Sequence, residues 1–169
     1  MNVLVVNCGS SSVKLSVYSK QKECHIVSMK AERLHTDQAQ YTDIDGEKHI
    51  LGNVKHDVAM QKMVAHIDID LHAVVHRVVH GGTKFTQPVA IDDEVLRVLR
   101  ELIPLAPLHN PANIAGIEAA QNSYPSLPHI AVFDTAFHTT LPRRASTYAI
   151  PRDMAKKYGI RRYGFHGPS

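Results

Sequence analysis

The stretch VLVVNCGSSSVKLSVY, residues 3–18, contains two apolar runs separated by a loop rich in glycine and serine. Residues 3–6 are all apolar, which is typical of a buried strand. Gly9 and the serines at 10–12 interrupt this run, and a strand-like pattern resumes at residues 13–18. Two strands on either side of such a loop predict a β-hairpin, so we expect the fold to begin as a sheet.

Strand and helix signals alternate along the rest of the chain. We expect further strands at residues 25–29, at 40–51 as a second hairpin around Asp45-Gly46, at 73–79 and at 130–133. We expect four helices: one from His56 with Met60, Val64 and Ile67 on one face, one capped by Asp92-Asp93 with Val95, Leu99, Leu102 and Ile103 on one face, one from an Asn110 cap and Pro111 to about Asn122, and a short one from Pro151 to a Gly159 cap. This order predicts an α/β domain with a mixed sheet and flanking helices.

Composition excludes several classes of protein. The 169 residues match one domain, and a net charge of +3 excludes a strongly basic nucleic-acid coat or an acidic tail. Hydrophobic residues make up 44% of the chain, as in globular proteins. The two cysteines form no CxxC pair, and the chain shows neither a signal-peptide pattern nor an apolar run long enough to span a membrane. We therefore expect a reduced, cytoplasmic protein.

The loop after the first strand is a candidate phosphate-binding site. Its small residues let the backbone approach a ligand, serine hydroxyls and backbone N–H groups can hold phosphate oxygens, and Lys14 adds a positive charge. A plain serine-rich turn accounts for the same residues. Neither GxxxxGK[ST] nor GxGxxG occurs, so P-loop and Rossmann sites are not supported.

The segment around Arg77 is a candidate anion site. Strand alternation places Arg77 and Val79 on one face, with His76 and His80 on the other. An inward arginine beside a small apolar side chain suits a small anion with a small apolar group. An outward or salt-bridged arginine is the alternative. A metal site from His76 and His80 is disfavoured, because HxxxH ligation needs a helix and this segment is extended.

Two further candidates lie at the ends of predicted elements. His109 precedes a helix start, where anions are favoured, although loop histidines are often purely structural. Asp134 follows the strand at 130–133, and ligands gather at the carboxyl ends of such strands. A carboxylate there can hold Mg²⁺ or act as a base, or it can simply cap a turn.

Five segments, in this order, closely resemble the acetate kinase family, which includes propionate kinases. They are VLVVNCGSSSVKLSVY at 3–18, HRVVHGGTKF at 76–85, LAPLHNPANIAGIEA at 105–119, AVFDTAFH at 131–138 and YGIRRYGFHGPS at 158–169. Residues 32–72 match only weakly. The resemblance implies a ribonuclease-H-like domain of the actin and sugar-kinase superfamily, phosphoryl transfer between ATP and acetate with Mg²⁺ (or Mn²⁺), and a homodimer.

The resemblance also implies roles for residues at the phosphate end of the site. Asn7 would contact the metal, Lys14 would bind the nucleotide phosphates, and Ser10 and Ser12 would line the phosphate loop.

At the acyl end, Arg77 would hold the carboxyl or acyl phosphate group, and Asp134 would be the catalytic carboxylate. His109 and His166 would hydrogen-bond the phosphoryl group in transit. Residues lining the pocket for the acetate methyl group would be Val79, Leu108 and Phe165. A valine at position 79 favours acetate over propionate, by about 1–3 kcal/mol for each methylene.

The family's second domain, which holds the adenosine, has no counterpart in these residues. We therefore expect the acyl-phosphate half of a site, with little catalysis by the chain alone. The alternatives are a propionate or butyrate kinase, or a non-catalytic domain that binds anions or a partner. Nucleic-acid binding is disfavoured, because the basic clusters are limited to the pairs at 143–144, 156–157 and 161–162.

Overall fold

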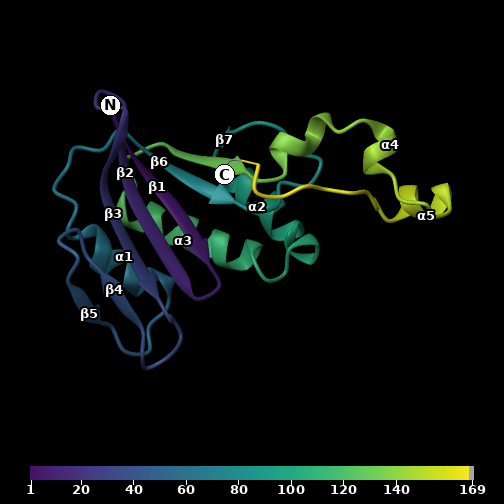
Figure 1. Ribbon diagram of the computed structural model, residues 1–169. Coiled ribbons are helices and arrows are strands. Elements are labelled where there is room, and N and C mark those ends of the chain that lie inside the picture. Colours follow the sequence, from purple (N-terminus) through teal and green to yellow (C-terminus); the bar gives the residue numbers. More distant parts are fainter. Residues whose placement is uncertain (168–169) are drawn as a thin grey trace.

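The computed structural model describes residues 1–167, and in these it shows one mixed sheet with helices packed against it (Figure 1). Pro168 and Ser169, which end the 158–169 segment, lie outside the described residues. The strands are β1 (Asn2–Gly9), β2 (Ser12–Ser19), β3 (Cys24–Glu32), β4 (Gln40–Thr42), β5 (Lys48–Ile50), β6 (Ala73–Val78), β7 (Val89–Ala90) and β8 (His129–Phe133). Their order across the sheet is β5-β4-β3-β2-β1-β6-β8-β7.

The direction of the strands changes at β1. From β1 to β5 each strand pairs antiparallel with the next along the chain. β6 pairs parallel with β1, β8 pairs parallel with β6, and β7 runs antiparallel on the edge. The carboxyl ends of β1, β6 and β8 therefore meet at one edge of the sheet, which is where α/β proteins collect their ligands.

The helical elements fall into two groups. They are α1 (His56–Val64), α2 (Asp93–Glu101), η1 (Ile103–Leu105), α3 (Asn110–Ser123), η2 (Ala136–Thr140), α4 (Arg143–Ser146) and α5 (Arg152–Lys157). α1 and α3 contact each other and cover the sheet over β1, β2, β3 and β6, and α2 packs on α3. α4 and α5 lie on a segment that projects from this body and returns to it, residues 141–163, which we call the arm (Figure 1).

Alternation along the strands turns successive side chains to opposite faces of the sheet, and the face under the helices is the more deeply buried one. The side chains buried under the helices from β1 and β2 are Leu4, Val6, Cys8, Val13, Leu15 and Val17. Asn7 and Lys14 alternate with these residues and so lie on the opposite face. Cys8 packs tightly, because a Cβ added to Gly116 of α3 would lie 2.3 Å from its Sγ. Burial raises the pKa of the Cys8 thiol to about 12.

Two histidines are hydrogen-bonded within the sheet. His76 Nε2 of β6 lies 3.0 Å from His129 Nδ1 of β8, and His129 Nε2 lies 3.1 Å from the carbonyl oxygen of Tyr124. A carbonyl only accepts, so His129 Nε2 carries the proton and its Nδ1 accepts from His76. Burial, and secondarily the charge of His129, lowers the pKa of His76 to about 3.

The structure confirms the predicted fold class, both hairpins and the strands at 73–79 and 130–133, with small differences at their ends. The first loop is shorter than expected. β1 continues to Gly9 and β2 begins at Ser12, so only Ser10 and Ser11 form the turn. Within the described residues, no helix is long and apolar enough to cross a membrane.

Three helix predictions need correction. α1 ends at Val64, and Ile67 lies beyond it, where its N–H bonds the Val64 carbonyl in a turn. α2 has the predicted Asp92 cap, but Leu102 and Ile103 lie outside it, and its buried residues are Leu96, Val98 and Leu99. The N-cap position of α3 is His109, which makes no side-chain capping bond, and Asn110 is the first helical residue, with its side chain bonded to a neighbouring loop.

Candidate active site

A cavity of about 700 Å³ opens where β1, β6 and β8 end, and we call it the central cavity. It is lined by residues from four strands, from the segment before α3 and from the end of the chain: Asn7, Cys8, Gly9, Ser12, Lys14, Lys30, Arg77, Val79, Leu105, Ala106, Pro107, Leu108, His109, Asp134, Phe165 and His166. Its volume is in the range of small-molecule sites.

A buried ion pair forms the floor of this cavity. Arg77 Nε donates to Asp134 Oδ1 at 2.9 Å, and Arg77 Nη2 donates to Asp134 Oδ2 at 2.6 Å. The carboxylate is fully buried and the arginine side chain is 26% exposed. Hydrogen bonds to Asp134 raise the pKa of Arg77, although partial burial acts in the opposite direction. The pair fixes a permanent cation at the end of β6.

The same guanidinium group holds two other residues. Arg77 Nη1 donates to Asn7 Oδ1 at 3.3 Å, and Nη2 lies 3.1 Å from His166 Nδ1. Arginine cannot accept a hydrogen bond, so His166 Nδ1 is the acceptor and its proton is on Nε2. Arg77 therefore uses four of its five N–H groups on neighbours. The remaining Nη1 hydrogen and the long contact to Asn7 are the positions open to an anion.

Polar side chains form a row across the sheet beside the pair. Lys30 of β3 is the register partner of Lys14 of β2, and Lys14 is the partner of Asn7. Asn7 is followed across the sheet by Arg77, one step beyond the pairing of Val6 with His76. Three of these four side chains are cationic. Lys30 is itself paired with Glu32, with Nζ 2.6 Å from Oε2. Like charges on directly opposite strand positions repel, so an anion bound beside Lys14 and Arg77 would stabilise the row.

Two buried asparagines of α3 hold the loops that carry the site. Asn113 Oδ1 accepts from the Val79 N–H at 3.0 Å, and its Nδ2 donates to the Cys8 carbonyl at 2.7 Å. Asn110 bonds both the N–H and the carbonyl of His80, at 3.3 and 3.1 Å. These contacts fix the end of β1 and the loop after β6 relative to each other.

The apolar end of the cavity is partly open. Val79 is half-buried in the wall, whereas Leu108 is 76% exposed and Phe165 is 46% exposed. His80 contacts Phe165 edge to face, with ring centroids 5.7 Å apart. His109 lines the cavity at the N-terminus of α3, where backbone N–H groups favour an anion.

The structure brings together nearly all the residues singled out in the sequence. Those that line the central cavity are Asn7, Ser12, Lys14, Arg77, Val79, Leu108, His109, Asp134, Phe165 and His166. Ser10 lies in the β1–β2 turn but is exposed at its tip and is not among the residues that line the cavity. Lys30 was missed, since its place beside Lys14 depends on strand register. Asn110 and Asn113 lie three residues apart, on one side of a helix, and this spacing was the sequence signal that both side chains could hold neighbouring loops.

The chemistry of the site fits a divalent cation. Asn7 offers an amide oxygen and Asp134 a buried carboxylate, and both are hard oxygen donors of the kind Mg²⁺ prefers. Arg77 contacts both of them, so a metal would share its ligands with the arginine.

The fold defines an α/β domain of the actin and sugar-kinase type. Comparison with known proteins gives the family. The acetokinase family model matches residues 2–169, and the chain belongs to that family. It is 44% identical to an acetate kinase of Pseudomonas aeruginosa (strain LESB58) and 48% identical to acetate kinase 1 of Vibrio vulnificus (strain CMCP6). Each alignment covers 99% of this chain and 44% of the relative.

Solved structures of an acetate kinase and a propionate kinase have a similar fold. A propionate kinase from Francisella tularensis subsp. tularensis SCHU S4 superposes with a TM-score of 0.89 at 37% identity. Porphyromonas gingivalis acetate kinase superposes with a TM-score of 0.88 at 41% identity. Each match covers 99% of this chain and 46% of the other. The chain therefore spans a little under half the length of the relatives it matches.

Proposed function

We propose that this chain supplies the acyl-phosphate half of an acetate kinase site, for the reversible reaction of ATP and acetate to acetyl phosphate and ADP. An acetate oxygen attacks the γ-phosphorus, the bond from that phosphorus to the ADP oxygen breaks, and ADP leaves. The observation that carries the proposal is the buried Arg77–Asp134 pair, with His166 bound to the same guanidinium, beside the half-buried Val79.

Each side chain has a role that follows from its chemistry. Phosphoryl transfer depends on placement and charge stabilisation more than on covalent catalysis. Arg77 holds the acyl phosphate, and Asp134 keeps the guanidinium oriented while it carries its own charge to the metal. His166 donates from Nε2 to the phosphoryl oxygens, and His109 donates from the opposite wall. Mg²⁺ (or Mn²⁺), bound by Asn7 and Asp134, would neutralise charge on the phosphates.

The remaining lining residues divide between the two substrates. Lys14 and Ser12 bind nucleotide phosphates at the β2 end, and Lys30 adds a cation to that end. Val79, Leu108 and Phe165 take the methyl group. Val79 limits the acyl chain to about two carbons, with a preference of about 1–3 kcal/mol per methylene. Propionate is the second candidate acid, because the relative with a TM-score of 0.89 is a propionate kinase. We place the protein in the cytoplasm as part of a homodimer that includes a nucleotide-binding domain.

Calorimetric titration of the purified chain with acetyl phosphate tests the half-site. We expect binding that is abolished in Arg77→Ala and retained in Arg100→Ala, which removes an exposed arginine paired with Glu118. Binding that survives Arg77→Ala would contradict the assigned cavity. We expect little acetyl phosphate formation by the chain alone with ATP, Mg²⁺ and acetate.

A chimera tests turnover. Joining this chain to the remaining residues of the Pseudomonas aeruginosa relative should give acetate-dependent formation of acetyl phosphate. Asp134→Asn should abolish that activity, and Arg100→Ala should leave it unchanged. Rates with acetate, propionate and butyrate would then rank the acids, and Val79→Ala should shift the ranking toward the longer ones by up to about tenfold. A folded chimera without turnover would count against a kinase and favour a non-catalytic anion-binding domain.

A further inference from the structure

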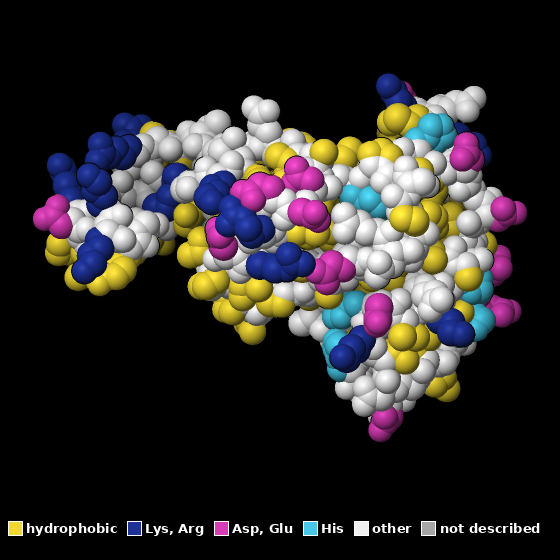
Figure 2. Space-filling view, turned by 180° about the vertical axis from the view of Figure 1, so that it is seen from behind, with side chains coloured by type: hydrophobic (Ala, Val, Ile, Leu, Met, Phe, Trp, Pro, Cys, Tyr) yellow, Lys and Arg dark blue, Asp and Glu magenta, His cyan; other side chains and the backbone are white. Residues whose placement is uncertain are grey.

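The arm concentrates the positive charge of the chain. Residues 141–163 hold seven of the 19 Lys and Arg residues and one of the 16 Asp and Glu residues, so the arm carries +6 and the rest of the chain −3. Figure 2 shows dark blue side chains gathered on the arm, whereas basic and acidic side chains are interspersed on the body. The net charge of +3 is therefore the sum of a positively charged arm and a negatively charged remainder of the chain.

At least one member of each basic pair, together with Arg152, lines a single cavity. This arm cavity, of about 820 Å³, has five cationic side chains on its wall: Arg143, Arg144, Arg152, Lys156 and Arg161. Asp153 is the one acid among its lining residues. The lining residues of the arm cavity and of the central cavity do not overlap, so the two are distinct.

These cations have no acidic partners within the described residues. All the ion pairs found in residues 1–167 lie on the body. On the arm, Arg161 Nε donates to the Arg162 carbonyl at 3.4 Å, and the Arg161 guanidinium lies 5.4 Å from the Tyr163 ring. Five cations around one concave surface repel each other unless an anion is present, and guanidinium groups bind phosphate oxygens in pairs.

The shape and lining of the cavity favour phosphate over nucleobases. Its volume suits a small molecule. Sites for single-stranded nucleic acid stack bases on aromatic side chains, and none of the described residues that line this cavity is aromatic. We propose that the arm cavity is a second anion site that binds a linear oligophosphate, with inorganic tripolyphosphate as its simplest representative.

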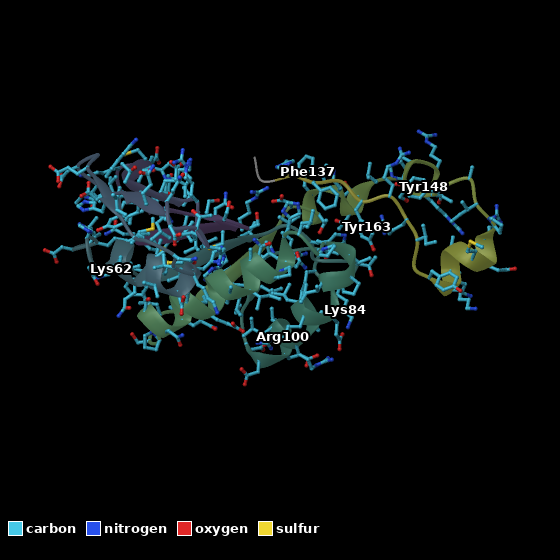
Figure 3. The ribbon with its side chains drawn as sticks, turned by 90° about the horizontal axis from the view of Figure 1, so that it is seen from below. Lys62, Lys84, Arg100, Phe137, Tyr148 and Tyr163 are labelled. Atoms are coloured by element: carbon cyan, nitrogen blue, oxygen red, sulfur yellow. The ribbon has the colours of Figure 1, made fainter. Side chains whose placement is uncertain are left out.

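Calorimetric titration of the 169-residue chain with tripolyphosphate tests this site. The variant Arg144→Ala/Arg152→Ala should bind at least about tenfold more weakly, with a shallower dependence of affinity on salt concentration. The matched control, Lys84→Ala/Arg100→Ala, removes the same charge from cations paired with Glu101 and Glu118 and should stay within about twofold. Figure 3 shows Lys84 and Arg100 on the body and Tyr148 on the arm.

Further measurements separate the alternatives. Arg77→Ala should retain tripolyphosphate binding at the arm, so a loss there would overturn the proposal in favour of the central cavity. An equal loss in the control variant would overturn it in favour of diffuse charge attraction. Tighter binding of a mixed-sequence single-stranded RNA through Arg144 and Arg152 would overturn it in favour of a nucleic-acid surface. Circular dichroism of each variant checks that the fold is intact.

Discussion

The body and the arm use charge in different ways. In the body, the Arg77 guanidinium is bonded to Asp134, Asn7 and His166, and the carboxylate is fully buried. On the arm, the cations around the cavity are without acidic partners in the described residues. A charge bonded to buried neighbours is preorganised and costly to leave without its partner, whereas charges without acidic partners are free to adjust to a ligand. Substitutions should therefore be costly in the body and nearly neutral on the arm.

The largest effect on the free energy of unfolding should come from lowering the pH, because His76 is buried. Its pKa is lowered from 6.5 to about 3 by burial, so between these pH values the unfolded chain binds a proton that the folded chain does not. The free energy of unfolding is therefore at its full value above pH 6.5 and falls as the pH drops toward 3. At 1.36 kcal/mol for each pKa unit, the loss amounts to at most about 5 kcal/mol.

Urea unfolding at a series of pH values measures this slope. His76→Gln removes the titrating group but keeps an N–H donor for His129, so the slope should become shallower. His25→Gln, which changes an exposed histidine of β3, should leave the slope as it is. Equal slopes in the wild type and His76→Gln would show that the core histidine is not responsible.

The next largest effect should come from Arg77→Ala. The substitution leaves the buried Asp134 carboxylate without its partner, and we expect a loss of about 3 kcal/mol in the free energy of unfolding. Arg77→Lys should lose less, because it keeps the charge. Arg100→Ala breaks an exposed pair with Glu118 and should cost at most about 1 kcal/mol. Similar losses in Arg77→Ala and Arg100→Ala, from denaturant titrations, would remove the contrast between buried and exposed pairs.

A smaller effect should follow from Gly116→Ala. The new Cβ would lie 2.3 Å from Cys8 Sγ and 2.8 Å from Cys8 Cβ, so the core must shift, at a cost of about 1–3 kcal/mol. The double variant Cys8→Ala/Gly116→Ala removes the sulfur and should recover part of that loss. Thermal unfolding of both variants and of Cys8→Ala completes the cycle, and additive effects would mean that the two side chains do not compete for space.

The smallest effect should come from the arm. Arg144→Ala should change the free energy of unfolding by no more than about 0.5 kcal/mol, because this cation has no acidic partner among the described residues. Denaturant titration against the wild type measures this. A loss above about 1 kcal/mol would show that a cation of the arm contributes to stability as much as an exposed ion pair of the body does.

Sequence patterns predicted what depends on local periodicity. The apolar alternation of residues 3–18 was sufficient for the first hairpin, and Asp92 was identified as a cap because its chemistry is local. The row from Lys30 to Arg77 could not be predicted in the same way, since it depends on the register of four strands. The arm cavity was not predicted, because the basic pairs at 143–144, 156–157 and 161–162 are visible in the sequence but their placement around one cavity depends on how the arm folds.

The same distinction between local patterns and features that depend on the fold applies to the site residues. The resemblance of five ordered segments to one family was enough to single out Arg77, Asp134 and His166, but their mutual hydrogen bonds could be found only from the fold. Asn110 was misassigned because an asparagine before a proline fits a helix cap equally well. Its side chain instead bonds His80, a loop residue 30 positions earlier.

The tight packing of Cys8 has a practical consequence for chemical labelling. Its thiol is buried against α3 with its pKa raised to about 12, so it presents almost no thiolate near neutral pH. Cys24 is exposed at the start of β3, at the end of the β2–β3 ladder opposite the Gly9–Ser12 turn. A maleimide dye should therefore attach at Cys24 alone in the native protein, providing a single reporter position without any engineered cysteine.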